Sequence, residues 1–401
     1  KYLVPDQNKV ERKFVADSLF GILSSKSIIL SDIAKALKES IKIKNTVERL
    51  SKNLDKDLSL EIEHNYTRQI IKKLDKDPVI LVDDSDIIKP HGHAFEALGM
   101  VRDGSSKGNS YEKGYMVTEI VGLSKYNKQP LSLFSHIHSS REKGYKSVNT
   151  VTFDGLEKVI KSLDGKGTFV FDRGYDMNSM FQFLHKRNQH FIIRLTEKRK
   201  LFWKGRWHKS TTLRDARKGK VKMSLTFRNR GKKTKTDVYV SHINVKITAS
   251  RAPIRLVLIY GLGNQPMMLA TNKAIQGKED LKTVVYTYMS RWRVEEYFRF
   301  KKQSLGFEGF RVRSLKAINN LNRLLTYAIG LIGIMAETKD ESRFVNRIMA
   351  SSRAIRKHIW FYYYRITDGL YNTLNYARTG IKKWFAIRNT GPRQLKFNLA
   401  S

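Results

Sequence analysis

The sequence of 401 residues contains no cysteine, which excludes disulfide bonds and zinc sites held by thiolates. No signal peptide opens it, because residues 1–8 are polar and no small-residue cleavage site follows. The longest apolar run, residues 324–336, falls short of the ~18–20 residues that a membrane-spanning helix needs. We therefore expect a protein of a reducing cytoplasm without a membrane partner, in which residues 324–336 form a buried helix.

Acidic residues are also scarce. Asp and Glu together number 37 against 76 Lys and Arg, which gives a formal net charge of +39. Nucleic acid is the partner that this balance favours, because each neutralised phosphate releases condensed counterions. An inert basic surface and an anionic membrane are the alternatives, but no basic amphipathic helix stands out as a membrane binder. The apolar fraction of 41% is high enough to bury cores and argues against global disorder.

The pattern of apolar residues predicts an α/β protein with additional helical regions, without internal repeats or low-complexity tracts. Five segments differ in composition: a helical DNA-binding domain (1–76), the first part of an α/β core (77–190), a β-rich insertion (191–272), the second part of the core (273–340) and a basic, aromatic C-terminal region (341–401). Within the last segment, residues 352–388 either follow a DNA backbone or bury their aromatic rings beneath solvated Lys and Arg.

Two short amphipathic helices are predicted in the first segment, near residues 31–37 and 46–51. Ser31 is a suitable helix cap, and Ile33 and Leu37 contribute to an apolar stripe. Two such helices joined by a turn suit a helix-turn-helix DNA reader, an interpretation that the net charge supports. An ordinary helical hairpin fits the same pattern.

Two predicted strands end in an acidic residue. Pro78–Asp83 and Thr168–Asp172 are short apolar runs that suit strands buried on both faces. Carboxylates gathered there repel one another unless a cation binds them, and two Mg²⁺ ions about 4 Å apart support phosphoryl transfer. The alternative role for each aspartate is a turn or a helix cap. Asp84 directly follows Asp83, and the strand-end argument does not separate the two.

Four polar residues share one narrow face of a predicted helix: Tyr288, Arg291, Glu295 and Lys302. At 100° per residue, their spacing keeps them within about 60° of one another. A face that combines an acid, two bases and a phenol can ligate a metal and grip a phosphate. The alternative is a solvated charged face.

The spacing of these four residues resembles the Tyr-Arg-Glu-Lys (YREK) signature of one branch of bacterial insertion-sequence DDE transposases. Segments 80–85 and 170–175 resemble those that carry the first and second catalytic aspartates of this family. In the family the first aspartate is commonly followed two residues later by Thr or Ser. Ser85 therefore favours Asp83 over Asp84 as the first catalytic acid.

The resemblance covers residues 78–310 and implies a ribonuclease H-like core with an all-β insertion between the second Asp and the Glu. The β-rich segment predicted from composition lies in the same interval. The resemblance implies that Asp83, Asp172 and Glu295 hold two Mg²⁺ ions, with Mn²⁺ as a substitute. These would support end cleavage and strand transfer by a cut-and-paste mechanism through a hairpin intermediate. The terminal DNA phosphates would be held by Tyr288, Arg291 and Lys302.

Two further features have a functional and a structural interpretation. In this family an aromatic residue of the insertion often stacks against a flipped base, for which Trp203 and Trp207 are candidates. Packing within a hairpin is the alternative for each. The pairs His91/His93 and His136/His138 have a spacing that could ligate a metal from a strand. No third ligand lies nearby in the sequence, which disfavours zinc.

The expected partners are double-stranded DNA with terminal inverted repeats, target DNA, and a second copy of the chain in a homodimeric synaptic complex at the bacterial nucleoid. One alternative is a domesticated, sequence-specific DNA-binding protein without cleavage activity, against which the presence of all three acids argues. Another is a ribonuclease H-like nuclease without strand transfer. The four-residue face argues against it, because a plain nuclease need not retain its cut end.

Overall fold

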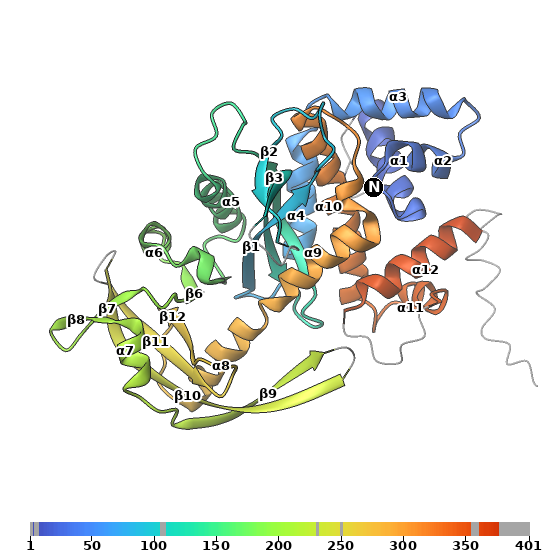
Figure 1. Ribbon diagram of the computed structural model, residues 1–401. Coiled ribbons are helices and arrows are strands. Elements are labelled where there is room, and N and C mark those ends of the chain that lie inside the picture. Colours follow the sequence, from blue (N-terminus) through green and yellow to red (C-terminus); the bar gives the residue numbers. More distant parts are fainter. Residues whose placement is uncertain are drawn as a thin grey trace, which may run out of the picture.

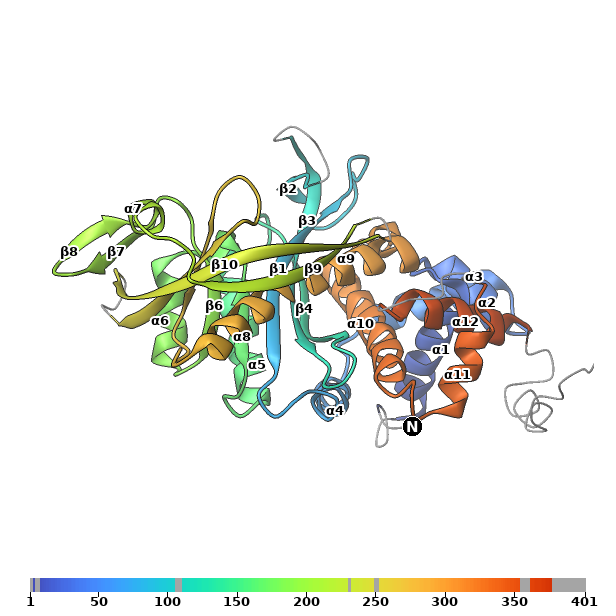
Figure 2. The ribbon, with the colours of Figure 1, turned by 90° about the horizontal axis from the view of Figure 1, so that it is seen from below.

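The computed structural model describes residues 3, 8–104, 110–229, 232–248, 252–353 and 361–376. In these residues a 12-stranded mixed sheet runs through the molecule, with helices on its faces and gathered at one end (Figure 1). The protein is therefore mixed α/β, as the apolar pattern predicts. Figure 2 shows the two ends: helices α1–α3 and α10–α12 lie at one, and the β7–β8 hairpin at the other.

Four helices precede the sheet: α1 (Lys9–Ser25), α2 (Leu30–Leu37), α3 (Ile43–Leu54) and α4 (Leu60–Ile71). The prediction that Ser31 caps α2 is wrong. The carbonyl of Ile29 already accepts a hydrogen bond from the N–H of Ile33 (3.1 Å), so the helix begins at Leu30 and Ser31 lies in its first turn. Ile33 is buried, which confirms the apolar stripe.

The centre of the sheet is built from β1 (Val79–Ile88), β5 (Thr168–Phe171) and β6 (His190–Arg194), which are adjacent and parallel. On the other side of β1 the strands are antiparallel: β2 (Gly99–Arg102), β3 (Tyr111–Leu123) and β4 (Pro130–His138). Helix α5 (Val148–Ser162) packs on β3 and β4, and the 3₁₀ turn η1 (Arg173–Tyr175) and α6 (Asn178–Lys186) connect β5 to β6. The core strands are buried, as their apolar sequences predict.

The segment predicted as an all-β insertion is mostly strand: β7 (Lys200–Trp203), β8 (Arg206–Lys209), β9 (Val221–Asn229), β10 (Lys232–Ile247), β11 (Pro253–Tyr260) and β12 (Met267–Thr271). It also contains the short helix α7 (Ser210–Asp215), so it is not all-β. Its β-branched pair Thr211 and Thr212 favours a strand, but burial of Leu213 in the core outweighs that preference. Strand β12 pairs with β6, so the segment continues the central sheet.

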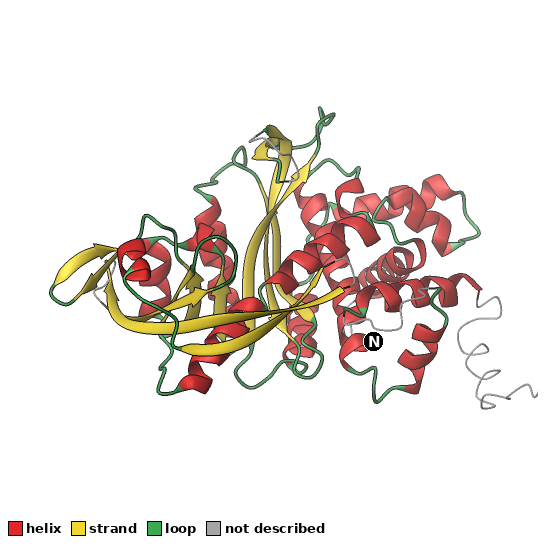
Figure 3. Cartoon of the chain, turned by 60° about the horizontal axis from the view of Figure 1, so that its bottom comes forward, coloured by secondary structure: helices red, strands yellow, loops and turns green. Residues whose placement is uncertain are grey.

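The helices that follow are α8 (Lys278–Met289), α9 (Trp292–Leu305), the 3₁₀ turn η2 (Phe307–Gly309), α10 (Leu315–Glu337), α11 (Arg343–Ala350) and α12 (Tyr363–Tyr376). Figure 3 shows helices gathered at one end of the molecule and long strands extending towards the other. Most of α10 is buried, which confirms the buried helix expected at 324–336. Part of the predicted aromatic tail, including Trp360 and residues 382–384, lies outside the described residues.

No single helix of the described residues has the length and apolarity to cross a membrane. The pair α1 and α2 reaches the required composition together, but the two helices meet at a bend of 96°.

A buried ion pair fixes α9 on the sheet. The Lys301 ammonium donates hydrogen bonds to Glu119 on β3 (2.9 Å) and to Ser135 on β4 (3.0 Å), and the side chains of Lys301 and Glu119 are fully buried. Ser132 donates a further hydrogen bond to Glu119. Burial lowers the pKa of Lys301, against the opposing effect of Glu119. Each charge is tolerated because the other is present, which sets the position of α9 along the sheet.

We expect Lys301→Met to reduce the free energy of unfolding by about 3–5 kcal/mol, because it leaves Glu119 as an unpaired buried charge. The double variant Lys301→Met/Glu119→Leu should recover much of this loss, since neither charge remains. Urea denaturation of the two variants measures the difference. A double variant that is less stable than Lys301→Met would contradict the interpretation.

Candidate active site

The ends of β1 and β5 bring two aspartates side by side. The parallel pairing of these strands ends with Val82 opposite Phe171. Asp83 directly follows Val82, and Asp172 directly follows Phe171. Residues level with one another on neighbouring parallel strands point to the same face of a sheet. The two acids predicted from the sequence are therefore neighbours on one face, where both side chains are half-buried.

The structure distinguishes Asp83 from Asp84, because successive side chains of a strand point to opposite faces. The carboxylate of Asp84 accepts hydrogen bonds from the hydroxyls of Thr118 (2.6 Å) and Tyr175 (2.7 Å). Asp83 instead lies beside Arg291, whose Nη1 is 3.4 Å from Asp83 Oδ2. Both oxygens of Asp84 are thus engaged within the protein, whereas Asp83 faces α9.

Arg291 joins the third acid to this pair. Its Nη2 lies 2.5 Å from Oε1 of Glu295, so the guanidinium bridges the carboxylates of Asp83 and Glu295. Burial lowers the pKa of Arg291, but Asp83 and Asp172 outweigh that effect and raise it above its ordinary value. A guanidinium of the same chain therefore contacts two of the three acids, and the charge of the third, Asp172, acts on it.

The electrostatics of Asp83 show the cost of this arrangement. Burial, together with the neighbouring Asp84 and Asp172, raises the pKa of Asp83 to about 7, although Arg291 acts in the opposite direction. Asp172 has a buried oxygen, Oδ1, without a hydrogen-bond partner in the described part of the chain. Repelling carboxylates and an unsatisfied carboxylate oxygen are the features that a divalent cation would relieve.

These carboxylates do not form a closed cation cage. Within the described ranges, no three His, Asp or Glu side chains are drawn together closely enough to form a metal site. Arg291 occupies the space between Asp83 and Glu295, and the Glu295 side chain is 51% exposed. The donor set fits a hard divalent ion that takes carboxylate and phosphate oxygens, provided that the guanidinium moves aside.

The prediction that Tyr288, Arg291, Glu295 and Lys302 lie on one continuous helix is wrong. Helix α8 ends at Met289 and α9 begins at Trp292. Arg291 donates its N–H to the carbonyl of Tyr288 (2.9 Å), a tighter turn that interrupts the regular helix hydrogen bonds. Ser290 also turns its hydroxyl to the carbonyl of Thr287 (2.6 Å).

Despite the break, Tyr288 stays close to Arg291, whereas Lys302 has different partners. Burial raises the pKa of Tyr288, and the charges that act on it include Arg291 and Asp172, so Tyr288 belongs to the same cluster. Lys302 lies further along α9, where its ammonium is 3.3 Å from Asp86 and 3.0 Å from Glu308. Lys302 therefore lies beside the strand that carries Asp83 but makes its ion pairs with other acids.

Trp203 and Trp207 lie on the β7–β8 hairpin, whose tight turn at Lys204 and Gly205 has positive φ at both residues. Trp203 packs edge-on to His208, with ring centroids 5.7 Å apart, and Trp207 packs similarly against Phe202 at 5.2 Å. In the sheet, β6, β12, β11 and β10 separate this hairpin from β5. The β7–β8 hairpin lies far from β1 (Figure 1), so the fold does not bring the two tryptophans to the acidic cluster of the same chain.

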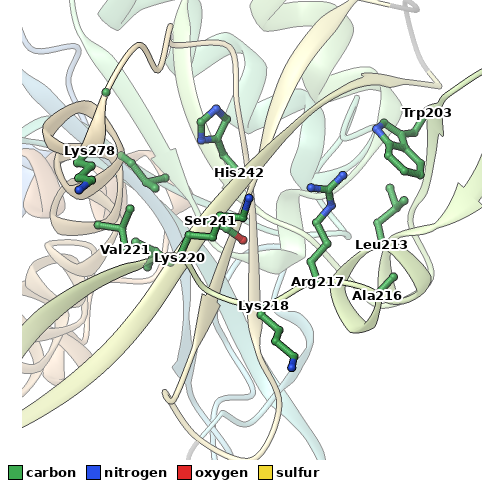
Figure 4. A pocket seen from close by; sticks show the side chains of 13 residues that line it. Trp203, Leu213, Ala216, Arg217, Lys218, Lys220, Val221, Ser241, His242 and Lys278 are labelled. Carbon is green, nitrogen blue, oxygen red and sulfur yellow. The ribbon is translucent and has the colours of Figure 1, made fainter.

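A cavity of about 590 Å³ lies beside Trp203, between α7, β9, β10 and the start of α8. Figure 4 shows its apolar lining, including Leu213 and Val221, and four cationic side chains among its lining residues: Arg217, Lys218, Lys220 and Lys278. The guanidinium of Arg217 is 5.3 Å from the centroid of the Trp203 ring. An apolar cavity with cationic side chains fits a nucleotide better than a metal ion.

The histidine pairs do not form a metal site in the described residues. His91 and His93 are exposed. His136 and His138 stack with ring centroids 6.4 Å apart, and burial is the main cause that lowers the pKa of each to about 4. Nε2 of His138 is 3.0 Å from the Thr118 hydroxyl, the same group that donates to Asp84. Sequence patterns did not reveal this contact, because the three residues lie on three different strands.

Comparison with known proteins decides the family. A model of the transposase DDE domain matches residues 74–331, which is more than half of the chain. The chain belongs to the DDE transposase family. This transposase is therefore an enzyme that cleaves DNA and transfers strands, in a family that generally uses divalent metal ions. The matched range contains both aspartates and Glu295.

No curated protein sequence matches this transposase. Among solved structures, it is similar to the piggyBac transposase in a synaptic complex with hairpin DNA, with a TM-score of 0.47 and 10% sequence identity. The match covers 99% of this chain and 79% of that chain.

The position of Arg291 predicts that it competes with metal in the DNA-free protein. At pH 8, above the pKa of about 7 of Asp83, we expect Arg291→Gln to raise the affinity for Mn²⁺ about tenfold, or about 1.4 kcal/mol. Isothermal titration calorimetry measures this affinity, and Arg299→Gln is the matched control, because Arg299 is exposed on the same helix. An affinity of Arg291→Gln equal to or below that of the wild type would contradict the prediction.

Proposed function

We propose that this transposase excises and inserts a DNA element by a cut-and-paste mechanism, with two Mg²⁺ ions held by Asp83, Asp172 and Glu295. The observation that carries the proposal is the arrangement of Asp83 and Asp172 at the ends of the paired strands β1 and β5, with Arg291 bridging Asp83 to Glu295 of α9. Mn²⁺ would substitute, because carboxylate and phosphate oxygens also suit that ion. The unsatisfied oxygen of Asp172 supports its assignment as a ligand.

The chemistry consists of two successive displacements at phosphorus. Mg²⁺ held by Asp83, Asp172 and Glu295 would supply positive charge that stabilises the oxygens of each displacement. In the first, a water oxygen bonds to phosphorus at the transposon end, the P–O3′ bond breaks, and the strand is released with a 3′-OH. In the second, that 3′ oxygen attacks another phosphodiester, so one P–O bond forms as one breaks. We propose that the first such attack is on the opposite strand and gives a hairpin, which water reopens before insertion.

The remaining residues of the cluster would hold DNA. On this proposal the phosphates of the cleaved end lie against Tyr288, Arg291 and Lys302. Arg291 is the most suitable of the three for a bidentate phosphate contact, because its planar guanidinium offers paired donors. Trp203 and Trp207 remain candidates for stacking on a flipped base, and the cavity beside Trp203 is large enough for a nucleotide.

Two finer assignments are supported, one by the strand order and one by the spacing of residues in the sequence. The arrangement in which β4 pairs with β3, followed by β3-β1-β5-β6, with β1, β5 and β6 parallel, is the arrangement of a ribonuclease H-like core, and we propose that fold. The YREK spacing supports membership of the corresponding branch of bacterial insertion-sequence transposases. We place the protein at the bacterial nucleoid, where its DNA substrates are.

Further partners follow from the same proposal. Double-stranded DNA with terminal inverted repeats and a target duplex would be bound, with α2 and α3 as the helix-turn-helix reader. Lys44, Glu48 and Lys52 line one exposed face of α3, which leaves polar side chains for DNA contacts. Two copies of the chain would bring the two ends together, since the tryptophans of one copy lie far along the sheet from its own acids.

The first test uses Glu295→Gln, which keeps the shape of the side chain but removes its charge. We expect cleavage of a labelled duplex carrying the element's ends to fall at least 10³-fold, while binding in a gel-shift assay changes less than threefold, because a carboxylate that holds metal for chemistry adds little to DNA affinity. Glu296→Gln is the matched control, since Glu296 lies beside Arg293 and Arg299 rather than in the cluster.

The control should cleave at the wild-type rate. Equal loss of binding and cleavage in Glu295→Gln would contradict a role in chemistry. Wild-type binding without cleavage at any Mg²⁺ or Mn²⁺ concentration would favour the domesticated DNA-binding protein. Cleavage without joined products would favour a nuclease.

A second pair of variants separates the adjacent acids. We expect Asp83→Asn to abolish Mg²⁺-dependent cleavage, because it removes a metal ligand. Asp84→Asn should retain cleavage within about tenfold, since an amide can still accept from Tyr175 and donate to Thr118. The measurement is the single-turnover rate on a denaturing gel. If Asp84→Asn abolished cleavage and Asp83→Asn retained it, Asp84 rather than Asp83 would be the metal ligand.

A further inference from the structure

Behind the proposed metal ligands, on the opposite face of the sheet, lies a buried chain of hydrogen bonds. The Tyr175 hydroxyl donates to Oδ2 of Asp84 (2.7 Å), and the Thr118 hydroxyl donates to Oδ1 (2.6 Å). The oxygen of Thr118 lies 3.0 Å from Nε2 of His138. Since Thr118 donates to Asp84, it accepts from His138, which places the proton of this neutral imidazole on Nε2.

The carboxylate of this network is expensive to bury, and the phenol beside it stays neutral. Burial raises the pKa of Asp84, and the hydroxyls of Thr118 and Tyr175 act in the opposite direction. Burial and the charge of Asp84 raise the pKa of Tyr175 well above its ordinary value. No cation among the described residues forms an ion pair with the Asp84 carboxylate, which is instead stabilised by the hydroxyls that donate to it. An apolar residue would fill the same space without this cost, so the chain of hydrogen bonds calls for a functional explanation.

The location of the network supplies that explanation. Tyr175 lies in η1, three residues after Asp172, and its N–H donates to the carbonyl of Asp172 (3.1 Å). Asp84 directly follows Asp83. The parallel pairing of β1 and β5 ends at Val82 and Phe171, before either proposed ligand. Beyond that point, the hydrogen bond from Tyr175 to Asp84 joins the two segments that carry Asp83 and Asp172.

We propose that Tyr175 and Asp84 are positioning residues that set the separation of the Asp83 and Asp172 carboxylates and thereby the affinity of the site for divalent metal. The inference rests on the proposed metal-binding role of these two aspartates. Thr118 and His138 extend the link to β3 and β4, so the carboxylate of Asp84 is fixed from two sides. Partners of metal ligands that fix their orientation typically contribute 10–100-fold to metal affinity.

The test compares two buried tyrosines. Tyr175→Phe removes the hydroxyl that reaches Asp84. Tyr66→Phe is the matched control, because its buried hydroxyl donates to the carbonyl of Ser132 (3.0 Å), away from the cluster. For each full-length variant we would measure the Mn²⁺ affinity by calorimetry, the Mg²⁺ concentration for half-maximal cleavage, and the melting temperature.

We expect both variants to melt at somewhat lower temperature, since each loses one buried hydrogen bond. Only Tyr175→Phe should weaken Mn²⁺ binding and raise the half-maximal Mg²⁺ concentration, both by about tenfold or more. Cleavage at saturating Mg²⁺ should fall much less than cleavage at low Mg²⁺. Unchanged metal affinity in Tyr175→Phe, or an equal shift in Tyr66→Phe, overturns the proposal.

Two variants of Asp84 provide a rescue experiment. Asp84→Ala removes both acceptors and should weaken Mn²⁺ binding as much as Tyr175→Phe, whereas Asp84→Asn retains both hydroxyl partners and should restore most of the affinity. Equal affinities of the two variants would contradict a positioning role. If the wild type shows no metal-dependent cleavage, the proposed function is overturned. If the wild type cleaves DNA but Tyr175→Phe binds metal as tightly as the wild type, only the positioning role is overturned.

Discussion

Two carboxylates held side by side at the ends of parallel strands need positive charge nearby, and much of this site follows from that need. Asp83 and Asp172 are brought together by the sheet, whose apolar strands are too deeply buried to move apart. Burial, to which the neighbouring carboxylates of Asp84 and Asp172 add repulsion, raises the pKa of Asp83 to about 7. Arg291 reduces that repulsion and draws Glu295 towards the pair. The break between α8 and α9 places Arg291 where one guanidinium reaches both acids.

The two faces of β1 divide the acidic run between different tasks. The face towards α9 holds Asp83 and, directly opposite it on β3, the fully buried Glu119 with its partner Lys301. The opposite face holds Asp84 with its hydroxyl donors. The charged partners on the first face come from α9 and from the break before it, whereas the neutral partners on the second come from strands and a turn. This division explains how Asp83 and Asp84 can be adjacent in sequence without belonging to one site.

The sequence predicted the parts of the site that depend on local patterns, and missed those that depend on pairing between strands. Apolar runs ending in Asp83 and Asp172 predicted the two strand ends, and the residue spacing predicted that Arg291 and Glu295 would lie on one helix face. The helix break at Ser290 carries no proline or glycine, so no local signal marked it. Helix α7 was missed because its threonines favour strands. The contact of Tyr175 with Asp84 depends on the register of β1 and β5, which a single sequence does not give.

The position of Arg291 has a consequence for the order of events on the proposed mechanism. One guanidinium cannot bridge Asp83 and Glu295 and also hold a DNA phosphate in the same place. Binding of the cleaved end would draw Arg291 away from the acids, and the acids would then gain from a divalent cation in its place. Because coupling between two binding events is reciprocal, metal would in turn strengthen the hold on DNA. A strongly basic protein meets much DNA without the correct end, and this coupling favours metal loading where a phosphate lies in the site.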